Sequence, residues 1–258
     1  SFLFVTLIIG KTYQKVKSSQ ADICGMSLIP KVFHQIWLQG NLPDEYKYLR
    51  DHMLELHPGW EYKLWTEENR PKLFNEEIYS LFDKLCYKAD ILRYEIIHKL
   101  GGIYIDTDFL FFKNIENLIN DDFFITREFP KNVVPNINNC IIGASPKHWL
   151  LEYVIMKIPE SYIKYNNIPK NKRNWTHDLD AVGPRFFDRI IREIAPEIAT
   201  RAIDAKYFSP FGSYAMPEAQ YKTYPEAYAI HLWNHRLGSS VIDIHKTLPC
   251  YKRKMIQS

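Results

Sequence analysis

The alternation of strand-like and helical segments from Pro30 onward is the feature that most restricts how this chain can fold. Apolar runs with the length of strands cover residues 31–37, 60–65, 103–105, 109–112, 123–126 and 140–144. Segments with helical character cover residues 44–56, 73–82, 86–100, 149–158 and 186–194. Buried strands that alternate with helices predict an α/β fold, with a mainly parallel central sheet flanked by helices.

Composition narrows the class further. The 258 residues are 46% apolar and 24% charged, which is typical of a globular protein and excludes a disordered or collagen-like chain. Lys and Arg number 33 against 30 Asp and Glu, without a basic block, so nucleic acid is not expected as a partner. The four cysteines are too scattered for a disulfide framework or a zinc site, although one or two bridges stay open.

The N-terminal residues allow two interpretations. Residues 2–9 form an apolar run, far shorter than the roughly 20 residues that span a bilayer. The run is either the end of a signal peptide or membrane anchor followed by a stem, or an ordinary strand or helix packed on the domain. The first interpretation predicts membrane association through the N-terminus, or the lumen of the Golgi or endoplasmic reticulum. The second predicts a cytoplasmic protein.

The segment 101–108, Gly-Gly-Ile-Tyr-Ile-Asp-Thr-Asp, carries the strongest chemical signal. Asp106 and Asp108 follow an apolar strand, at the edge of the sheet where α/β proteins bind ligands. Two carboxylates so close together raise each other's pKa unless a cation lies between them. Mg²⁺ or Mn²⁺ would take these oxygen ligands and keep positions for phosphate oxygens. The alternative is a solvated turn, in which aspartate is common.

The preceding helical segment adds a second pair. Asp90 and Arg93 are three residues apart, so both lie on one face of a helix. They either form an ordinary ion pair within the helix or hold the hydroxyls of a sugar by charge-assisted hydrogen bonds. The pair alone does not decide between these roles.

Together these segments resemble the glycosyltransferases that contain a DXD sugar-binding region. The matching stretches are residues 29–37, 88–93, 101–108, 182–184 and 229–234, in the same order along the chain. The superfamily includes initiating and sphingolipid mannosyltransferases, alpha-galactosyl- and N-acetylglucosaminyltransferases and, more distantly, clostridial glucosylating toxins. The resemblance implies a catalytic domain of the GT-A fold over residues 29–258, preceded by an apolar segment and linker over residues 1–28.

The resemblance also implies an activity. We expect a Mn²⁺- or Mg²⁺-dependent transfer of a hexose from a UDP- or GDP-sugar to a hydroxyl of a glycan, lipid or protein, with retention of the anomeric configuration. Two alternatives remain open: a metal-dependent phosphohydrolase or nucleotidyltransferase, and a domain that binds nucleotide sugars without turnover. The first usually needs a further acidic or histidine cluster, which the sequence does not show near Asp106.

Individual roles follow from the same resemblance. Asp106, Asp108 and His231 match metal ligands, with His231 alternatively a contact of the diphosphate. Asp90 and Arg93 match groups that hold the donor sugar and, with the two motif aspartates, form the predicted catalytic set. Trp37 matches an aromatic that stacks on the nucleotide base, although a core tryptophan at a strand end is equally consistent with the sequence. Further substrate contacts are expected at Gln35, Tyr104, Asn138, Asn139, Asp180, Gly183 and Asn234.

Two expectations concern less regular segments. Which of Asn138 and Asn139 faces the site depends on strand register, because a slip of one residue swaps the two faces. Asp178 and Asp180 are candidates for an acceptor contact or a base. Residues 159–174 are expected to form a mobile loop or a helical insertion, and residues 170–173 could add positive charge over the donor.

Overall fold

The computed structural model describes residues 28–128, 137–212 and 224–233. The predicted N-terminal segment, apart from Leu28, and the predicted contact Asn234 lie outside these residues. No helix in the described ranges has the length and apolar character needed to cross a membrane.

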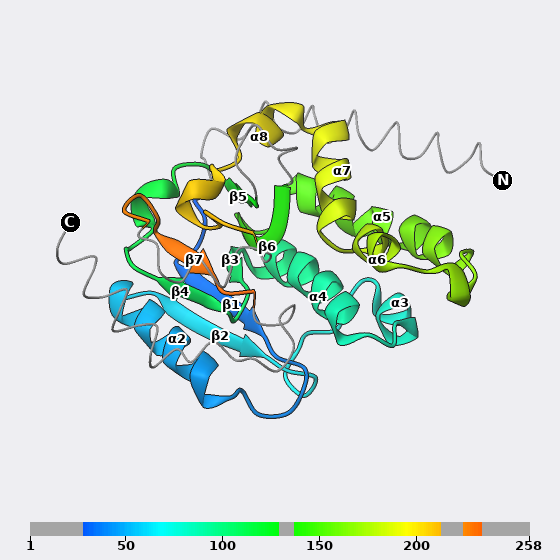
Figure 1. The fold of residues 1–258 in the computed structure, drawn as a ribbon, viewed down its shortest axis with the longest axis horizontal. Helices are drawn as coiled ribbons and strands as arrows, with labels where there is room; N and C mark the ends of the chain where they lie inside the picture. Colours follow the sequence, from blue (N-terminus) through cyan, green and yellow to red (C-terminus); the bar gives the residue numbers. More distant parts are fainter. Residues whose placement is uncertain (1–27, 129–136, 213–223, 234–258) are drawn as a thin grey trace.

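A central sheet of five strands organises the molecule, in the order β2-β1-β3-β6-β5 (Figure 1). Its strands are β1 (Val32–Ile36), β2 (Glu61–Trp65), β3 (Gly102–Ile105), β5 (Phe123–Arg127) and β6 (Ile137–Ala144). β1 pairs in parallel with β2 and β3, whereas β6 runs antiparallel to both β3 and β5. Four strands therefore share one direction, which confirms the mainly parallel sheet. A second, two-stranded sheet pairs β4 (Phe109–Phe111) with β7 (Ala229–His231).

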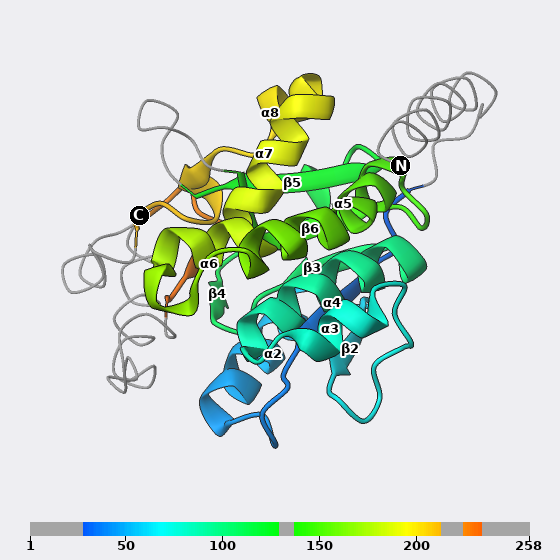
Figure 2. The same cartoon turned by 90° about the vertical axis from the view of Figure 1, so that its right-hand side faces the viewer.

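Helices cover both faces of the central sheet (Figures 1 and 2). α4 (Leu85–Leu100), α5 (Trp149–Asn166) and α7 (Pro184–Ile194) pack on one face. α2 (Asp44–Leu56) packs on the other face, together with β4 and β7. Shorter elements complete the described chain: α3 (Glu76–Leu81), α6 (Trp175–Ala181), α8 (Pro196–Arg201), η1 (Glu116–Leu118), η2 (Lys170–Lys172) and η3 (Ala205–Tyr207).

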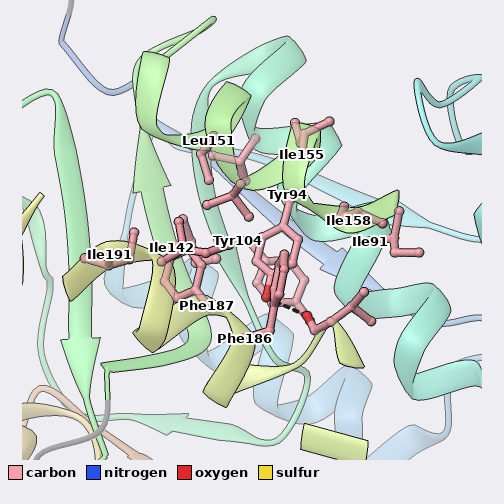
Figure 3. Packing of buried hydrophobic residues seen from close by; sticks show 14 of the residues in the cluster. Ile91, Tyr94, Tyr104, Ile142, Leu151, Ile155, Ile158, Phe186, Phe187 and Ile191 are labelled. Atoms are coloured by element: carbon pink, nitrogen blue, oxygen red, sulfur yellow. Dashed lines mark hydrogen bonds between the residues drawn. The ribbon is translucent and has the colours of Figure 1, made fainter. Parts of the chain in front are cut away.

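Alternation along the strands divides the core into two layers. Tyr104 faces the helices α4, α5 and α7, while its neighbours Ile103 and Ile105 face α2 and β4. In the helical layer Tyr94 stacks on Phe187, with ring centroids 5.4 Å apart, and its hydroxyl donates to the carbonyl of Val182 at 2.9 Å (Figure 3). This packing fixes α4 and α7 to one another beside the ends of the strands.

The passage from α4 into β3 depends on two glycines. Gly101 and Gly102 have φ angles of +66° and +96°, which residues with a Cβ atom rarely adopt. A Cβ atom on Gly101 would lie 2.7 Å from Pro146, and one on Gly102 would lie 2.6 Å from Val32. The helix predicted over residues 86–100 thus ends at Leu100, and the two glycines turn the chain into β3 and toward Asp106.

Several predicted boundaries need correction. The helix predicted over residues 73–82 is limited to α3, and the strand predicted at 140–144 begins at Ile137. The helix predicted to end at residue 158 continues through Pro159 to Asn166, and of the two predictions for residues 159–174 the helical one is therefore closer to the structure than the loop. Proline removes a helical hydrogen bond, but burial of Ser161 and Tyr165 in the following turns offsets that loss.

Candidate active site

The two motif aspartates lie at the junction of the two sheets. β3 ends at Ile105 and β4 begins at Phe109, so the Asp-Thr-Asp segment connects them. The backbone N–H of Asp106 donates to the carbonyl of Cys140 at 3.0 Å, and the N–H of Leu232 donates to the carbonyl of Asp108 at 2.8 Å. Backbone hydrogen bonds from β6 and from the residue after β7 thus fix both aspartates in place.

His231 joins the aspartates from a distant part of the sequence. Its Nε2 lies 3.1 Å from Oδ1 of Asp108 and 4.0 Å from Oδ2 of Asp106. The imidazole is sandwiched between the rings of Phe109 and Trp233, with centroid distances of 4.6 and 4.0 Å. Stacking on both ring faces fixes the direction in which Nε2 points.

Electrostatics favour a cationic imidazole in the absence of metal. Burial by itself lowers the pKa of His231, but the adjacent carboxylate of Asp108 raises it well above its ordinary value. Asp108 and His231 are both almost fully buried, so this pairing is poorly screened by water.

The same trio fits a divalent cation. One ligand atom from each of Asp106, Asp108 and His231 can be chosen so that all lie within 4.8 Å of one another. Two carboxylates and an imidazole suit Mn²⁺, while Mg²⁺ prefers an all-oxygen shell. With Asp90 nearby, three carboxylates face a single guanidinium and a single imidazole, so added positive charge would balance the group.

Arg93 connects the predicted residues into one network. Its guanidinium lies 3.2 Å from the carboxylate of Asp90 and 3.2 Å from that of Asp106. It donates to the backbone carbonyl of Asn139 at 2.9 Å and stacks over the ring of Tyr104, 4.4 Å from the centroid. Tyr104 in turn donates its hydroxyl hydrogen to Asp106. Arg93 is therefore the hub of the site, a stronger role than that of an ordinary helix-surface ion pair.

The register of β6 decides between the two asparagines. The side-chain amide of Asn139 donates to Asp90 at 2.8 Å, whereas that of Asn138 donates to Glu128 at 2.9 Å. Burial raises the pKa of Asp90 to about 6, against the opposing effects of Arg93 and Asn139. Asn139 is thus part of the Asp90–Arg93 network, while Asn138 borders the same cavity from a different hydrogen-bonding group.

A bulge in β6 lies at this point. Ile125 of β5 pairs with Ile142, but the next residue, Thr126, pairs with Asn138, so the register shifts around Asn139–Ile141. Beside this shift, the backbone carbonyl of Asn139 accepts from Arg93 and that of Cys140 accepts from the N–H of Asp106. Bulges next to active sites commonly redirect backbone groups in this way.

Two cavities meet at the aspartates. The first lobe, of about 340 Å³, is lined by Trp37, Leu38, Ala89 and Tyr104 among others. The second lobe, of about 350 Å³, is lined by residues that include Tyr87, Asn139, Asp178, Gly183 and Trp233. Both lobes share a wall formed by Cys86, Arg93, Asp106 and Asp108. The candidate metal ligands therefore lie at the boundary between two separate binding spaces.

Trp37 and Gln35 have different relations to the first lobe. Trp37 lines it, although the residue is only 7% exposed and its Nε1 donates to the carbonyl of Asn41. Gln35 lies behind the site: its amide donates to the backbone carbonyl of Asp106 at 3.3 Å, and its oxygen accepts from the hydroxyl of Tyr62. Gln35 therefore positions the motif backbone and is not among the residues that line either lobe.

The structure separates Asp178 from Asp180. Asp178 lines the second lobe and accepts from the hydroxyl of Tyr87 and from Lys84, which is 2.9 Å away. Asp180 points elsewhere and pairs with Arg185 at 3.1 Å. Neither lobe is lined by residues 170–173, so the structure does not bring their positive charge to the site.

Cys86, Tyr87, Thr107 and Trp233 line the lobes but were not predicted as site residues. Cys86 could have been found from spacing, because it lies four residues before Asp90 and seven before Arg93 on the same face of α4. Trp233 lies in the matched C-terminal stretch and has a φ angle of +56°, a backbone conformation that the sequence does not reveal.

Comparison with known proteins indicates the class of enzyme. A family profile described as a glycosyltransferase sugar-binding region containing the DXD motif matches residues 43–125. An uncharacterized glycosyltransferase of Acanthamoeba polyphaga mimivirus is 28% identical over 216 residues, which cover 79% of this chain and 82% of that protein. Inositol phosphoceramide mannosyltransferase 3 of Schizosaccharomyces pombe is 28% identical over 144 residues, which cover 54% of this chain but only 39% of the relative.

A solved structure supports the fold. The PaToxG glycosyltransferase superposes with a TM-score of 0.55 at 16% identity, covering 74% of this chain and 79% of that one. The yeast mannosyltransferase relatives are longer proteins, of which the chain spans 39 to 54%. The comparisons therefore support a transferase: the chain has the GT-A fold, and its residues 43–125 are similar to the glycosyltransferase sugar-binding region that contains the DXD motif.

Proposed function

We propose that this enzyme transfers a hexose from a UDP- or GDP-sugar to an acceptor hydroxyl in a reaction that depends on a divalent cation. The observation that carries the proposal is the convergence of Asp106, Asp108 and His231 at the boundary between the two lobes. A cation held by these three residues would border both lobes. In a nucleotide sugar the diphosphate links the nucleoside to the sugar, so we expect it to bind at this boundary.

The cation, which we expect to be Mn²⁺, would be held by Asp106, Asp108 and His231. When bound, it supplies positive charge that stabilises the departing nucleoside diphosphate. The chain itself prepares the ligands: Arg93 and Tyr104 hold the carboxylate of Asp106, and the stacked rings of Phe109 and Trp233 hold His231. Ligands fixed in advance lose little entropy when the cation and donor bind.

The first lobe suits the nucleoside. Trp37 offers an aromatic face, and Leu38, Leu85 and Ala89 supply apolar surface around it. A flat heterocycle stacked there would place its ribose and diphosphate toward Asp106 and Asp108 at the shared wall. The predicted base contact of Trp37 is thus compatible with its burial, because the residue is packed on one side and borders a cavity on the other.

The second lobe suits the transferred sugar and the acceptor. Asp90, Arg93 and Asn139 form a buried set of charged and amide groups that can bind sugar hydroxyls. Asp178 and Gly183 line the same lobe, and we place the acceptor hydroxyl beside them. Retention of the anomeric configuration is implied by the family resemblance, with the acceptor attacking from the face that the diphosphate leaves.

The relatives suggest the chemical class of the acceptor. Several are named for inositol phosphoceramide or for lactosylceramide, so their acceptors are lipids that display hydroxyls in the headgroup. We propose an acceptor of this class for this enzyme, with mannose and galactose as the first sugars to test. A glycan or protein hydroxyl is the alternative acceptor.

A donor panel tests the proposal directly. UDP-glucose, UDP-galactose, UDP-N-acetylglucosamine and GDP-mannose would each be incubated with MnCl₂ or with EDTA, in the presence and absence of an inositol phosphoceramide or lactosylceramide acceptor. We expect one donor to release nucleotide only with Mn²⁺, and faster with acceptor, and the product to keep the donor's anomeric configuration by NMR. Nucleotide release that ignores every acceptor would favour a hydrolase, and binding without release would favour a non-catalytic domain.

A further inference from the structure

Large apolar side chains are exposed where α3, α5 and α6 come together. Leu81, Ile163 and Trp175 are 62%, 59% and 53% exposed. Their elements are joined beneath this surface, because Phe82 packs edge-on against Tyr162 with ring centroids 5.2 Å apart. Figure 2 shows α3, α4 and α6 on the side that faces the viewer. Ile163 of α5 and Trp175 of α6 lie on either side of η2 in the sequence.

The same side carries an excess of positive charge. Lys164 pairs with Glu160 at 2.7 Å, but residues 165–177 contain Lys170, Lys172 and Arg173 without an aspartate or glutamate, in a chain whose basic and acidic residues nearly balance. Lys170 and Lys172 lie in η2 and are exposed. We refer to residues 163–175 as the α5–α6 tip.

The tip has a defined conformation. The guanidinium of Arg173 lies over the ring of Tyr165, 4.3 Å from its centroid, and donates to the carbonyl of Ile168 at 3.0 Å. Asn174 begins α6 by accepting from the N–H of His177, which completes a capping box. Lys170, Lys172 and Trp175 therefore lie on an ordered turn, and all three side chains are exposed.

The tip also adjoins the active site. Trp175 lines the second lobe, together with Asp178, Leu179 and Gly183 of the following turns. A surface that contacts the tip would therefore lie beside the lobe where the acceptor is proposed to enter. This proximity connects the exposed patch with the chemistry of the enzyme.

We propose that the α5–α6 tip docks the enzyme on an anionic lipid surface, with Ile163 and Trp175 inserting shallowly and Lys170 and Lys172 contacting lipid phosphates. Single apolar side chains from separate elements, with lysines between them, suit the interface of a membrane. A bound peptide would instead need a continuous apolar groove. Delivery of a lipid acceptor from this surface into the second lobe rests on the proposed function, but the docking itself does not.

Vesicle binding tests the proposal. The full chain would be sedimented with vesicles of phosphatidylcholine alone and of phosphatidylcholine mixed with phosphatidylserine. We expect binding only to the anionic vesicles, and a partition coefficient about 25-fold lower for the double variant Lys170→Ala/Lys172→Ala, at about fivefold for each lysine near the surface. Brominated lipid should quench tryptophan fluorescence, and Trp175→Phe should remove most of that quenching.

Lys72→Ala/Lys99→Ala is the matched control, because both lysines are exposed and line a separate pocket near the C-terminal end of α4. It should bind vesicles within about twofold of the unchanged protein. Equal losses in the two double variants, or no loss in Lys170→Ala/Lys172→Ala, would overturn the proposal. Binding to vesicles of phosphatidylcholine alone that is as strong as binding to the anionic vesicles would also overturn it, because such binding would not depend on lipid charge.

Nucleotide binding separates this proposal from the proposed function. The Lys170→Ala/Lys172→Ala variant should bind UDP or GDP with Mn²⁺ as the unchanged enzyme does, because neither lysine lines a lobe. A protein that binds anionic vesicles through the tip but binds no nucleotide would retain the docking surface and contradict the transferase proposal. A protein that binds nucleotide but no anionic vesicle would be consistent with the transferase proposal and would contradict docking through the tip.

Discussion

The two lobes of the cleft differ in how the chain builds them. The first lobe draws on the end of β1, the first turns of α4 and the segment after β3, all within residues 36–108. The second lobe combines α4 with β6, α6, the start of α7 and β7, which extend to Trp233. Under the proposed function, recognition of the nucleotide would depend on a compact part of the sequence, while recognition of sugar and acceptor would depend on contacts between distant segments.

The contrast has a chemical counterpart. Outside the wall that both lobes share, the first lobe offers Trp37 with Leu38, Leu85 and Ala89, a set that suits a flat ring. The second lobe contains Asp90, Asn138, Asn139, Asp178 and Lys84, so it offers many hydrogen-bonding groups. Variation in the second lobe would change the sugar or acceptor without disturbing nucleotide binding. The shared wall is the one place where a substitution should affect both.

Asp108→Asn should have the largest effect, because it removes a charge from the shared wall while keeping the shape of the side chain. We expect transfer to fall about 1000-fold, as for the loss of a group that stabilises developing charge. Manganese binding, followed by electron paramagnetic resonance, should weaken in parallel. Asp180→Asn is the matched control, since Asp180 pairs with Arg185 outside both lobes. Full activity in Asp108→Asn would remove the metal role.

Arg93→Lys should follow, with a loss of about 100-fold in kcat/KM and a lower Tm. Lysine keeps the charge but lacks the planar fork that contacts Asp90, Asp106 and the carbonyl of Asn139 together. Both lobes should be affected, so KM for the donor and for the acceptor should rise. Arg185→Lys, on the exposed ion pair with Asp180, should leave activity and Tm unchanged. An effect confined to one substrate would contradict the hub role of Arg93.

Acid should lower the stability of the folded protein through His34, a fully buried residue of β1. Burial lowers the pKa of His34 to about 4, even though a hydrogen bond with the carbonyl of Gly101 opposes this. The unfolded chain binds the proton near pH 6.5, so stability is complete above that pH and falls as the pH decreases toward 4. At pH 5 the loss for this residue is about 2 kcal/mol in the free energy of unfolding. Denaturant unfolding at pH 7.5 and pH 5 should show it, and His34→Gln should lessen the difference between the two.

The smallest effects should separate the lobes. Trp37→Ala removes an aromatic face from the first lobe, so binding of UDP or GDP should weaken about tenfold. Asp178→Asn changes only the second lobe, so nucleotide binding should stay within about twofold while the acceptor KM rises. Isothermal titration with nucleotide and initial rates with varied acceptor give the two readouts. A large drop in the Tm of Trp37→Ala would instead support a purely structural role for this tryptophan.

Much of the fold could be predicted because its signals are local. Apolar runs and helical spacing located every described strand except β7 and most of the described helices, and the helix predicted over residues 86–100 ends before Gly101 as α4 does. The boundaries that failed, such as the continuation of α5 through Pro159, depend on packing that overrides local preference. Likewise, the reversal of β6 depends on its partners in the sheet, which a single sequence does not display.

The site residues also fall into two groups, those with a local sequence signal and those whose role depends on long-range contacts. Asp90, Arg93, Asp106 and Asp108 stand in two short motifs, and the structure brings them together with His231, which was identified by resemblance alone. The choice between Asn138 and Asn139 required the bulge in β6, and the choice between Asp178 and Asp180 required the orientation of α6. Gln35 could be placed near the site but not assigned to the support of the Asp106 backbone, because that role depends on a long-range hydrogen bond.

The pairing of β4 with β7 has a consequence for biosynthesis. Phe109 lies opposite His231, and the N–H of Leu232 reaches back to the carbonyl of Asp108 across more than a hundred intervening residues. A ribosome must therefore have released nearly the whole domain before the third side chain of the trio reaches the first two. Under the proposed function, a nascent chain could fold its central sheet early and still transfer no sugar until β7, the last strand of the described residues, pairs with β4.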